Sequence, residues 1–202
     1  MKLLLQVFVA LIFTNGISQN APIDFEPGGF GDTWTWTVFE NDSNPSLQIV
    51  PNPDPSGINT SSTVAKFTAL QAGNPWAGCE TQHGSDIGTF SITSSNNIVR
   101  IMVYKTKISD VGIKLVTSSA ASLGEIKVAN TVINQWEQLT FDFSDHIGGM
   151  TYDQLVVYPD YVARSADDII YFDNVFGDQA FLSTEELIKP QLILSNYHIN
   201  WL

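Results

Sequence analysis

The feature that most constrains the fold is a hydrophobic period of two residues, which recurs along the chain from Ile23 onward. Apolar and polar side chains alternate as they do in half-buried strands, and no stretch shows the longer period of an amphipathic helix. The alternating segments are TWTWTVF (33–39), TVAKFTAL (63–70), NIVRIMVY (97–104), VGIKLV (111–116), EIKVAN (125–130), WEQLTFDF (136–143) and QLVVYP (154–159). The sequence therefore predicts an all-β chain of about ten or eleven short strands.

Clusters of Gly, Pro, Asn and Ser separate these segments and mark turns, for example at residues 51–57, 71–78 and 93–97. Many short strands joined by such turns are typical of two packed antiparallel sheets. The chain has 202 residues, 44% of them hydrophobic, which is enough for one sizeable core. We predict an antiparallel β-sandwich of the jelly-roll type, formed as one domain.

The two ends of the chain differ from this central region. Residues 1–18 carry one lysine, an apolar run shorter than the roughly 20 residues of a membrane span, and small residues at Gly16 and Ser18. This pattern predicts a signal peptide, so the mature protein is expected to be secreted or displayed at the cell surface. Strand alternation stops after Gly177, which divides a domain at residues 19–177 from a tail at 178–202.

Charge and cysteine content narrow the range of partners. The formal net charge is −12, and the acids are scattered along the chain. Nucleic acid is a poor partner for such a surface, because phosphate contacts need Lys and Arg. Cys79 is the single cysteine, so an internal disulfide is excluded, and stability has to come from the core, to which a bound metal ion can add.

Signatures of catalysis are absent from the sequence. No Gly-x-Ser-x-Gly motif is present, the candidate strands lack closely spaced carboxylates, and the three histidines are too far apart in sequence for a zinc site. The remaining neighbouring acids fall in or beside loops, where solvent-facing positions are expected. We therefore predict no catalytic residue.

The acids near the two ends of the domain match a hard cation better than they match zinc. Asp24 and Glu26 are two residues apart on the expected first strand, so their carboxylates should share one side of it. Asp173 lies in the expected last strand, and the first and last strands of a sandwich are commonly neighbours. These three acids are predicted to bind a structural calcium ion. The alternative is that they face solvent at a sheet edge.

One loop combines an aromatic residue with polar groups suited to a sugar. Trp76 follows Asn-Pro in a Gly-rich turn, where no strand period directs its indole inward, and Glu80 and His83 follow within eight residues. Sugars are bound by an aromatic ring stacked on their C–H face and by polar groups that pair with hydroxyls. We predict the main binding site here. The alternative is that Trp76 caps one end of the sandwich.

Three further residues are secondary candidates for sugar contacts. Trp36 shares one side of its strand with Trp34, which is typical of core residues but also of a stacking platform. Tyr104 ends one strand, where it can be ordinary surface or a ligand contact. Arg164 lies in a loop and can pair with Asp167 or with the adjacent Asp168, or contact a uronate or sulfate.

A family resemblance rests on several of these segments. APIDFEPGGFG and YFDNVFG resemble the ends of calcium-bearing jelly-roll carbohydrate-binding modules of the galactose-binding-like type. WTWTVFEN, NPDPSGINTSSTVAKFTA, AGCETQHG and MVYKTKISDVGIKLV are similar to secreted Bacteroidetes modules attached to polysaccharide-degrading enzymes. The resemblance implies calcium ligands at Glu26 and Asp173, with Asp24 matching less well. FLSTEE resembles the opening of a type IX sorting segment, here without its usual Tyr-Pro-Asn-Pro turn.

Together these features favour a non-catalytic module that binds a polysaccharide by aromatic stacking and hydroxyl hydrogen bonds, with a structural calcium ion. Two alternatives stay open. One is a small jelly-roll hydrolase or lyase that uses His83, Glu80 and Tyr104 for proton transfer. The other is a surface adhesion module without sugar affinity.

Overall fold

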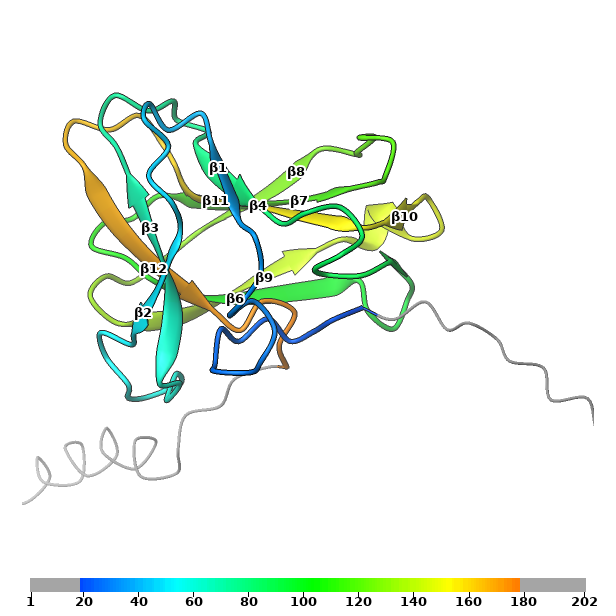
Figure 1. Cartoon of the computed structure of the whole chain (residues 1–202), viewed down its shortest axis with the longest axis horizontal. Helices are drawn as coiled ribbons and strands as arrows, with labels where there is room; N and C mark the ends of the chain where they lie inside the picture. The colour runs from blue at the N-terminus through cyan, green and yellow to red at the C-terminus, as the bar shows by residue number, and fades with distance from the viewer. Residues whose placement is uncertain (1–18, 179–202) are drawn as a thin grey trace, which may run out of the picture.

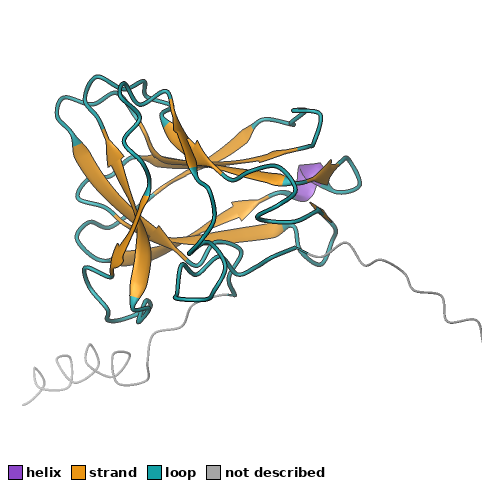
Figure 2. Ribbon diagram, in the orientation of Figure 1, coloured by secondary structure: helices purple, strands orange, loops and turns teal. Residues whose placement is uncertain are grey.

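The computed structural model describes residues 19–178, which form two antiparallel sheets packed face to face (Figures 1 and 2). The predicted signal peptide (1–18) and residues 179–202 of the predicted tail lie outside the described range. Within that range all regular structure is strand except one short 3-10 helix, η1 (Ser144–His146). The prediction of an antiparallel β-sandwich of the jelly-roll type is confirmed.

Each main sheet has five strands, and strands that are distant in sequence lie side by side. The β11 sheet has the order β1 (Thr37–Phe39), β4 (Gly78–Glu80), β11 (Gln154–Tyr161), β7 (Asp110–Val116) and β8 (Glu125–Ala129). The β12 sheet has the order β2 (Gln48–Pro51), β3 (Thr63–Ala69), β12 (Asp168–Asp173), β6 (Ile98–Tyr104) and β9 (Trp136–Asp142). A small pair, β5 (Phe90–Ser91) and β10 (Thr151–Tyr152), lies beside η1 at one end.

The core fills the space between the two sheets. Alternate residues of each strand point inward, as the period of two requires, so Ile113 and Val157 of the β11 sheet join the same cluster as Ile101 and Phe172 of the β12 sheet. All four side chains are fully buried. The alternating residues that remain point to the outer faces of the sheets and are therefore available for function.

The first and last segments of the domain are neighbours, but the first is not a strand. Ile23 and Val175 exchange two backbone hydrogen bonds, of 2.9 and 3.0 Å. Phe25 has a left-handed backbone with φ of 53°, which interrupts the extended conformation. The predicted first strand is therefore reduced to isolated bridges at Ile23. The strand predicted at 33–39 is also shorter than expected: in the structure only Thr37–Phe39 form β1.

An irregularity in β11 buries a charge. The register with β7 shifts between Tyr158 and Tyr161, and Asp160 between them is fully buried. Its carboxylate lies 3.4 Å from Lys105 Nζ, and Lys107 Nζ and Arg164 Nη1 lie 3.1 and 3.5 Å away. Removing a carboxylate from such a cluster is costly, because the cations keep their desolvation without a partner.

Burial by itself raises the pKa of Asp160. The hydrogen bond from Ser109 and the charges of Lys105 and Lys107 outweigh it, so the pKa lies below its ordinary value. The carboxylate therefore stays ionised. Burial also lowers the pKa of Lys105, and Asp160 opposes this effect.

Replacing this carboxylate should test the cluster. We expect Asp160→Ala to lower the free energy of unfolding by about 3–5 kcal/mol, because Lys105 and Arg164 are left buried without their countercharge. Urea unfolding followed by tryptophan fluorescence measures the change. Asp145→Ala, at an exposed acid, is the control and should stay within about 0.5 kcal/mol of the unmodified protein. Equal stabilities for the two variants would contradict the role assigned to Asp160.

Candidate functional site

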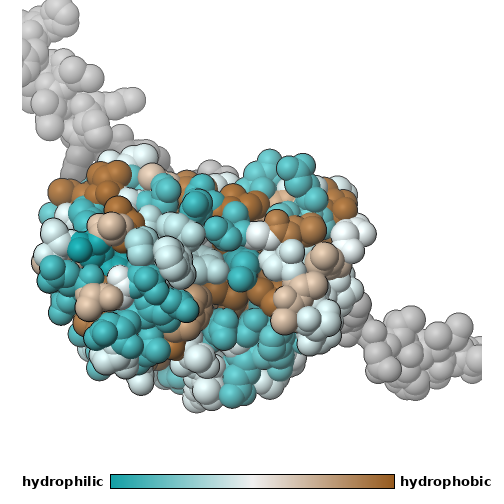
Figure 3. All heavy atoms as spheres, turned by 90° about the horizontal axis from the view of Figure 1, so that it is seen from above, coloured by the Kyte–Doolittle hydropathy of each residue, from teal (hydrophilic) through white to brown (hydrophobic). Residues whose placement is uncertain are grey.

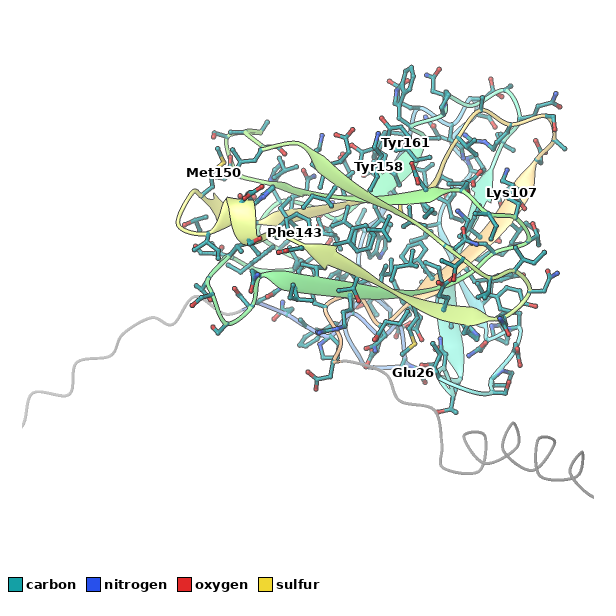
Figure 4. All side chains as sticks on the ribbon, turned by 180° about the vertical axis from the view of Figure 1, so that it is seen from behind. Glu26, Lys107, Phe143, Met150, Tyr158 and Tyr161 are labelled. Atoms are coloured by element: carbon teal, nitrogen blue, oxygen red, sulfur yellow. The ribbon has the colours of Figure 1, made fainter. Side chains whose placement is uncertain are left out.

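The outer face of the β11 sheet carries an aromatic cluster that the sequence does not bring together. Phe39 of β1 and Tyr161 of β11 pack against Tyr158 of β11 on the side opposite the core. The ring centroids of Phe39 and Tyr158 are 5.8 Å apart, and those of Tyr158 and Tyr161 are 5.5 Å apart. We call these three residues the aromatic trio. Figure 4 shows Tyr158 and Tyr161 together on this sheet, far from Glu26.

The trio depends on two glycines and on the irregularity in β11. Gly78 of β4 and Gly112 of β7 flank Tyr158, and a Cβ at Gly112 would lie 2.9 Å from the Tyr158 ring. In a regular strand, residues three apart point to opposite faces, so Tyr158 and Tyr161 could not meet. The register shift between them turns Tyr161 onto the same face, which is a typical use of a β-bulge.

Charged side chains follow the trio in the next row of the same face. Strand register places Glu80, Val156, Lys114 and Glu125 side by side across β4, β11, β7 and β8. Burial raises the pKa of Glu80, and the charges of Lys114 and His83 oppose this effect. In Figure 3, which looks onto this side of the molecule, brown apolar side chains emerge among teal hydrophilic ones.

A further lysine completes the charge pattern. Lys127 Nζ lies 4.2 Å from the centre of the Tyr161 ring, a cation–π contact, and Tyr161 Oη donates a hydrogen bond of 3.4 Å to Glu125. Two lysines and two glutamates therefore share this face, and Asp110 of β7 lies on it opposite Tyr161. The excess of acids on this face is small, although the protein as a whole is strongly acidic.

His83 follows Glu80 three residues along the chain, and its ring is held by the carboxylate of Asp153. Its Nδ1 is 2.7 Å from Asp153 Oδ1, and the side chain is 40% exposed. The carboxylate fixes the orientation of the ring, so the other ring nitrogen has a defined direction. The structure thus places two predicted sugar contacts, Glu80 and His83, close enough to interact electrostatically.

Trp76 lies in the turn before β4 and is 45% exposed. Arg164 holds this turn, since its Nη2 donates a hydrogen bond of 2.7 Å to the carbonyl of Asn74. The Arg164 side chain is fully buried and forms its ion pair with Asp160, rather than with Asp167 or Asp168. It therefore supports the loop and does not face solvent, where a uronate or sulfate would have to bind.

The other two candidates lie away from this face. Trp36 packs against the core, where its ring lies 5.8 Å from Phe25 and 6.2 Å from Phe172. Tyr104 is on the outer face of the β12 sheet, packed edge-on against Trp136 and Tyr171. The structure therefore does not join these two residues to Trp76, Glu80 and His83.

Sequence reasoning missed most of the face. It selected none of six residues that the structure brings together here: Phe39, Tyr158, Tyr161, Lys114, Glu125 and Lys127. A signal was present in the two glycines, which interrupt apolar strands at 78 and 112 and can mark the close approach of a neighbouring side chain. Only strand pairing shows which side chain approaches them.

At the opposite sheet, two of the three predicted metal ligands lie near each other. Asp173 is fully buried and accepts hydrogen bonds from Asn59 Nδ2 at 2.9 Å and from the backbone N–H of Asn174 at 2.7 Å. Burial raises the pKa of Asp173 to about 6, and the charge of Asp24 adds to this effect. A buried carboxylate with neutral donors and a second acid beside it has the chemistry of a hard-cation site.

Glu26, the third predicted metal ligand, forms hydrogen bonds with the backbone of another segment. Its Oε1 accepts hydrogen bonds from the backbone N–H groups of Ser62 and Thr63, at the start of β3. Among residues 19–178, no group of three or more His, Cys, Asp or Glu side chains is arranged to hold a metal ion. Of the three predicted ligands, Asp24 and Asp173 lie close enough to interact, and a cation held by them would need neutral oxygens such as backbone carbonyls as its other ligands.

Comparisons with known proteins bear on the fold. No protein-family model and no curated protein matches the chain. Similar solved structures include an arabinose-bound α-L-arabinofuranosidase, with a TM-score of 0.53 and 12% identity over 78% of this chain and 25% of that one. An exo-β-agarase has a TM-score of 0.52 and 7% identity over 84% of this chain and 26% of that one. A xylan-binding domain from Paenibacillus barcinonensis has a TM-score of 0.47 and 15% identity over 84% of this chain and 97% of that one. The chain spans about a quarter of either enzyme.

The raised pKa of Asp173 predicts a pH-dependent stability in a chelator. The proton is held more tightly in the folded state, so the stability associated with this group is present at low pH and is lost as pH rises from about 4 to about 6. Asp173→Asn removes the charge. In urea unfolding with EDTA, we expect the variant to exceed the unmodified protein by up to about 3 kcal/mol at pH 7 and to match it at pH 3.5. A difference independent of pH would contradict this account.

Proposed function

We propose that this chain is a non-catalytic carbohydrate-binding module, which binds a polysaccharide on the outer face of the β11 sheet. The observation that carries the proposal is the aromatic trio, held on an outer sheet face by two glycines and a bulge. Phe39 and Tyr161 are half-buried and pack over the buried ring of Tyr158. Exposed parts of such rings offer C–H contacts to sugar rings, and Glu80 and Lys114 beside them can pair with hydroxyls. Export of the protein, through the segment at 1–18, is part of the same proposal.

The charge pattern favours an uncharged glycan. Lys114 is countered by Glu80, and Lys127 lies against Tyr161, whose hydroxyl is bonded to Glu125. An anionic polysaccharide would need cations free of such partners. We therefore expect laminarin, xylan or mannan, rather than alginate, as the class of ligand.

Calcium is proposed as a structural element, with Asp24 and Asp173 as its carboxylates. The backbone beside both acids is left-handed, with φ of 53° at Phe25 and 49° at Asn174. Strained backbone of this kind is found at ligand clamps. The ion would neutralise the buried charge of Asp173 and connect the beginning of the domain with its end.

The structure offers less for the enzymatic alternative. Glu80 lies on the outer face of the β11 sheet, whereas Tyr104 lies on that of the β12 sheet. The three residues considered for proton transfer therefore do not share one site.

Within residues 19–178, no helix is long and apolar enough to cross a membrane.

Matched tyrosines on the two outer faces test the proposed site. We expect Tyr161→Ala to weaken binding to a neutral polysaccharide at least about tenfold, or 1.4 kcal/mol, because it removes a ring of the aromatic trio. Tyr171→Ala removes a comparable half-buried ring from the β12 sheet and should leave binding unchanged. Affinity gel electrophoresis on laminarin, xylan, mannan and alginate measures the effect.

The same panel contains the outcomes that would contradict the proposal. No retardation of the unmodified protein on any glycan would rule out the carbohydrate-binding function. Equal losses for Tyr161→Ala and Tyr171→Ala would place the site elsewhere. Retardation by alginate alone would contradict the preference for uncharged glycans.

Calcium removal gives an independent measurement. At a calcium concentration about 100 times the dissociation constant, we expect a melting temperature about 5–10 °C above that in EDTA, because the ion binds only the folded state. The double variant Asp24→Asn/Asp173→Asn should lose this difference, whereas Asp145→Asn should keep it. Identical melting curves of the unmodified protein in calcium and EDTA would remove calcium from the proposal.

A further inference from the structure

Loops at one end of the sandwich border an open hollow that is separate from the outer face of the β11 sheet. Its volume is about 440 Å³, which is in the range of small-ligand sites. The residues that line it are Asp42, Leu70, Gln71, Ala72, Arg164 and Asp167. None of them belongs to the aromatic trio or to the charged row beside it, so the hollow is a distinct feature of the surface.

The loop at residues 70–77 is braced on both sides. Arg164 Nε donates to the carbonyl of Leu70 at 3.0 Å, and Arg164 Nη2 donates to that of Asn74 at 2.7 Å. From the other side, Asn41 Oδ1 accepts the N–H of Leu70 at 2.8 Å, and Asn41 Nδ2 donates to the carbonyl of Thr68 at 2.7 Å. A loop held in this way loses little conformational freedom when a ligand binds.

This braced loop also carries Trp76, which is the most exposed tryptophan of the described residues, at 45%. The other tryptophans in that range pack against apolar clusters, as Trp36 does. An indole left in water gains little for folding. A rigid loop that presents an exposed indole, and whose residues Leu70, Gln71 and Ala72 line a hollow, is instead the arrangement expected of a binding site.

The chemistry of the lining selects an uncharged polyol. Asp167 is fixed by the N–H of Gln71, which donates to its Oδ1 at 2.7 Å, and Asp42 is the second carboxylate. The charge of Arg164 is already countered by Asp160, so the hollow is net negative. Carboxylates accept hydrogen bonds from sugar hydroxyls and repel uronates and sulfates, while Leu70 and Ala72 supply apolar contact.

We propose that the loop-end hollow, together with Trp76, is a second sugar site that takes a short uncharged oligosaccharide. This inference rests on the proposed function, because it assigns a second position to the same class of ligand. Two separate sites on one module would also raise its avidity for a polysaccharide that reaches both.

The test compares variants of the two sites on short ligands. Trisaccharides of xylose, mannose and β-1,3-glucose are titrated into the full chain by calorimetry. We expect Trp76→Ala and Asp167→Asn each to lower the affinity at least about tenfold. Tyr171→Ala, on the outer face of the β12 sheet, should keep the affinity of the unmodified protein, and Tyr161→Ala measures whether the β11 face takes the same ligands. Thermal melts confirm that all four variants are folded, as the exposure of Trp76 and Asp167 leads us to expect.

The outcomes separate this inference from the function on which it rests. If trisaccharides bind and Tyr161→Ala abolishes binding while Trp76→Ala and Asp167→Asn do not, the loop-end site is overturned and the β11 face stands. If polysaccharides bind but no trisaccharide does, the loop-end site is again overturned. If neither trisaccharides nor polysaccharides bind, both proposals fail.

Discussion

The buried carboxylate of Asp160 is the interaction on which the functional surfaces depend. It lies at the irregularity of β11, where the shifted register turns Tyr161 onto the outer face. The same carboxylate pairs with Arg164, and this arginine braces the loop that carries Trp76. The aromatic trio and the loop-end hollow therefore share one electrostatic anchor, although they present different chemistry to solvent.

A second buried acid shows the opposite situation. Asp160 has three cations within 3.5 Å and a lowered pKa, whereas Asp173 has neutral hydrogen-bond donors, a neighbouring Asp24 and a raised pKa. Taking an ion out of water is unfavourable unless a countercharge replaces the lost hydration. For Asp160 the protein itself supplies the countercharge, through Lys105, Lys107 and Arg164. For Asp173 it has to come from a proton or from a metal ion, which is the physical basis of the calcium proposal.

Much of the fold could be predicted because the period of two residues is a local property. It places Ile101, Ile113, Val157 and Phe172 inside without any knowledge of which strands are neighbours. The candidate site was harder. Trp76 was selected because it lies outside that period, and Glu80 and His83 because they are near it in sequence; all three stay predictions. Tyr104 was selected at the end of a strand, but it belongs to the other sheet, since nothing local says which sheet a strand will join.

By itself, the sequence determined an all-β sandwich with one core, an acidic surface, no disulfide and an aromatic loop at 71–78, because composition and alternation act over short distances. Tertiary structure alone decided that β1, β4, β11, β7 and β8 are neighbours and that Phe39 and Tyr161 meet over two glycines. It also decided that Arg164 is buried while Trp76 is exposed. These outcomes depend on strand pairing between residues as distant in sequence as Cys79 and Val157, and on a bulge that reverses the direction of one side chain.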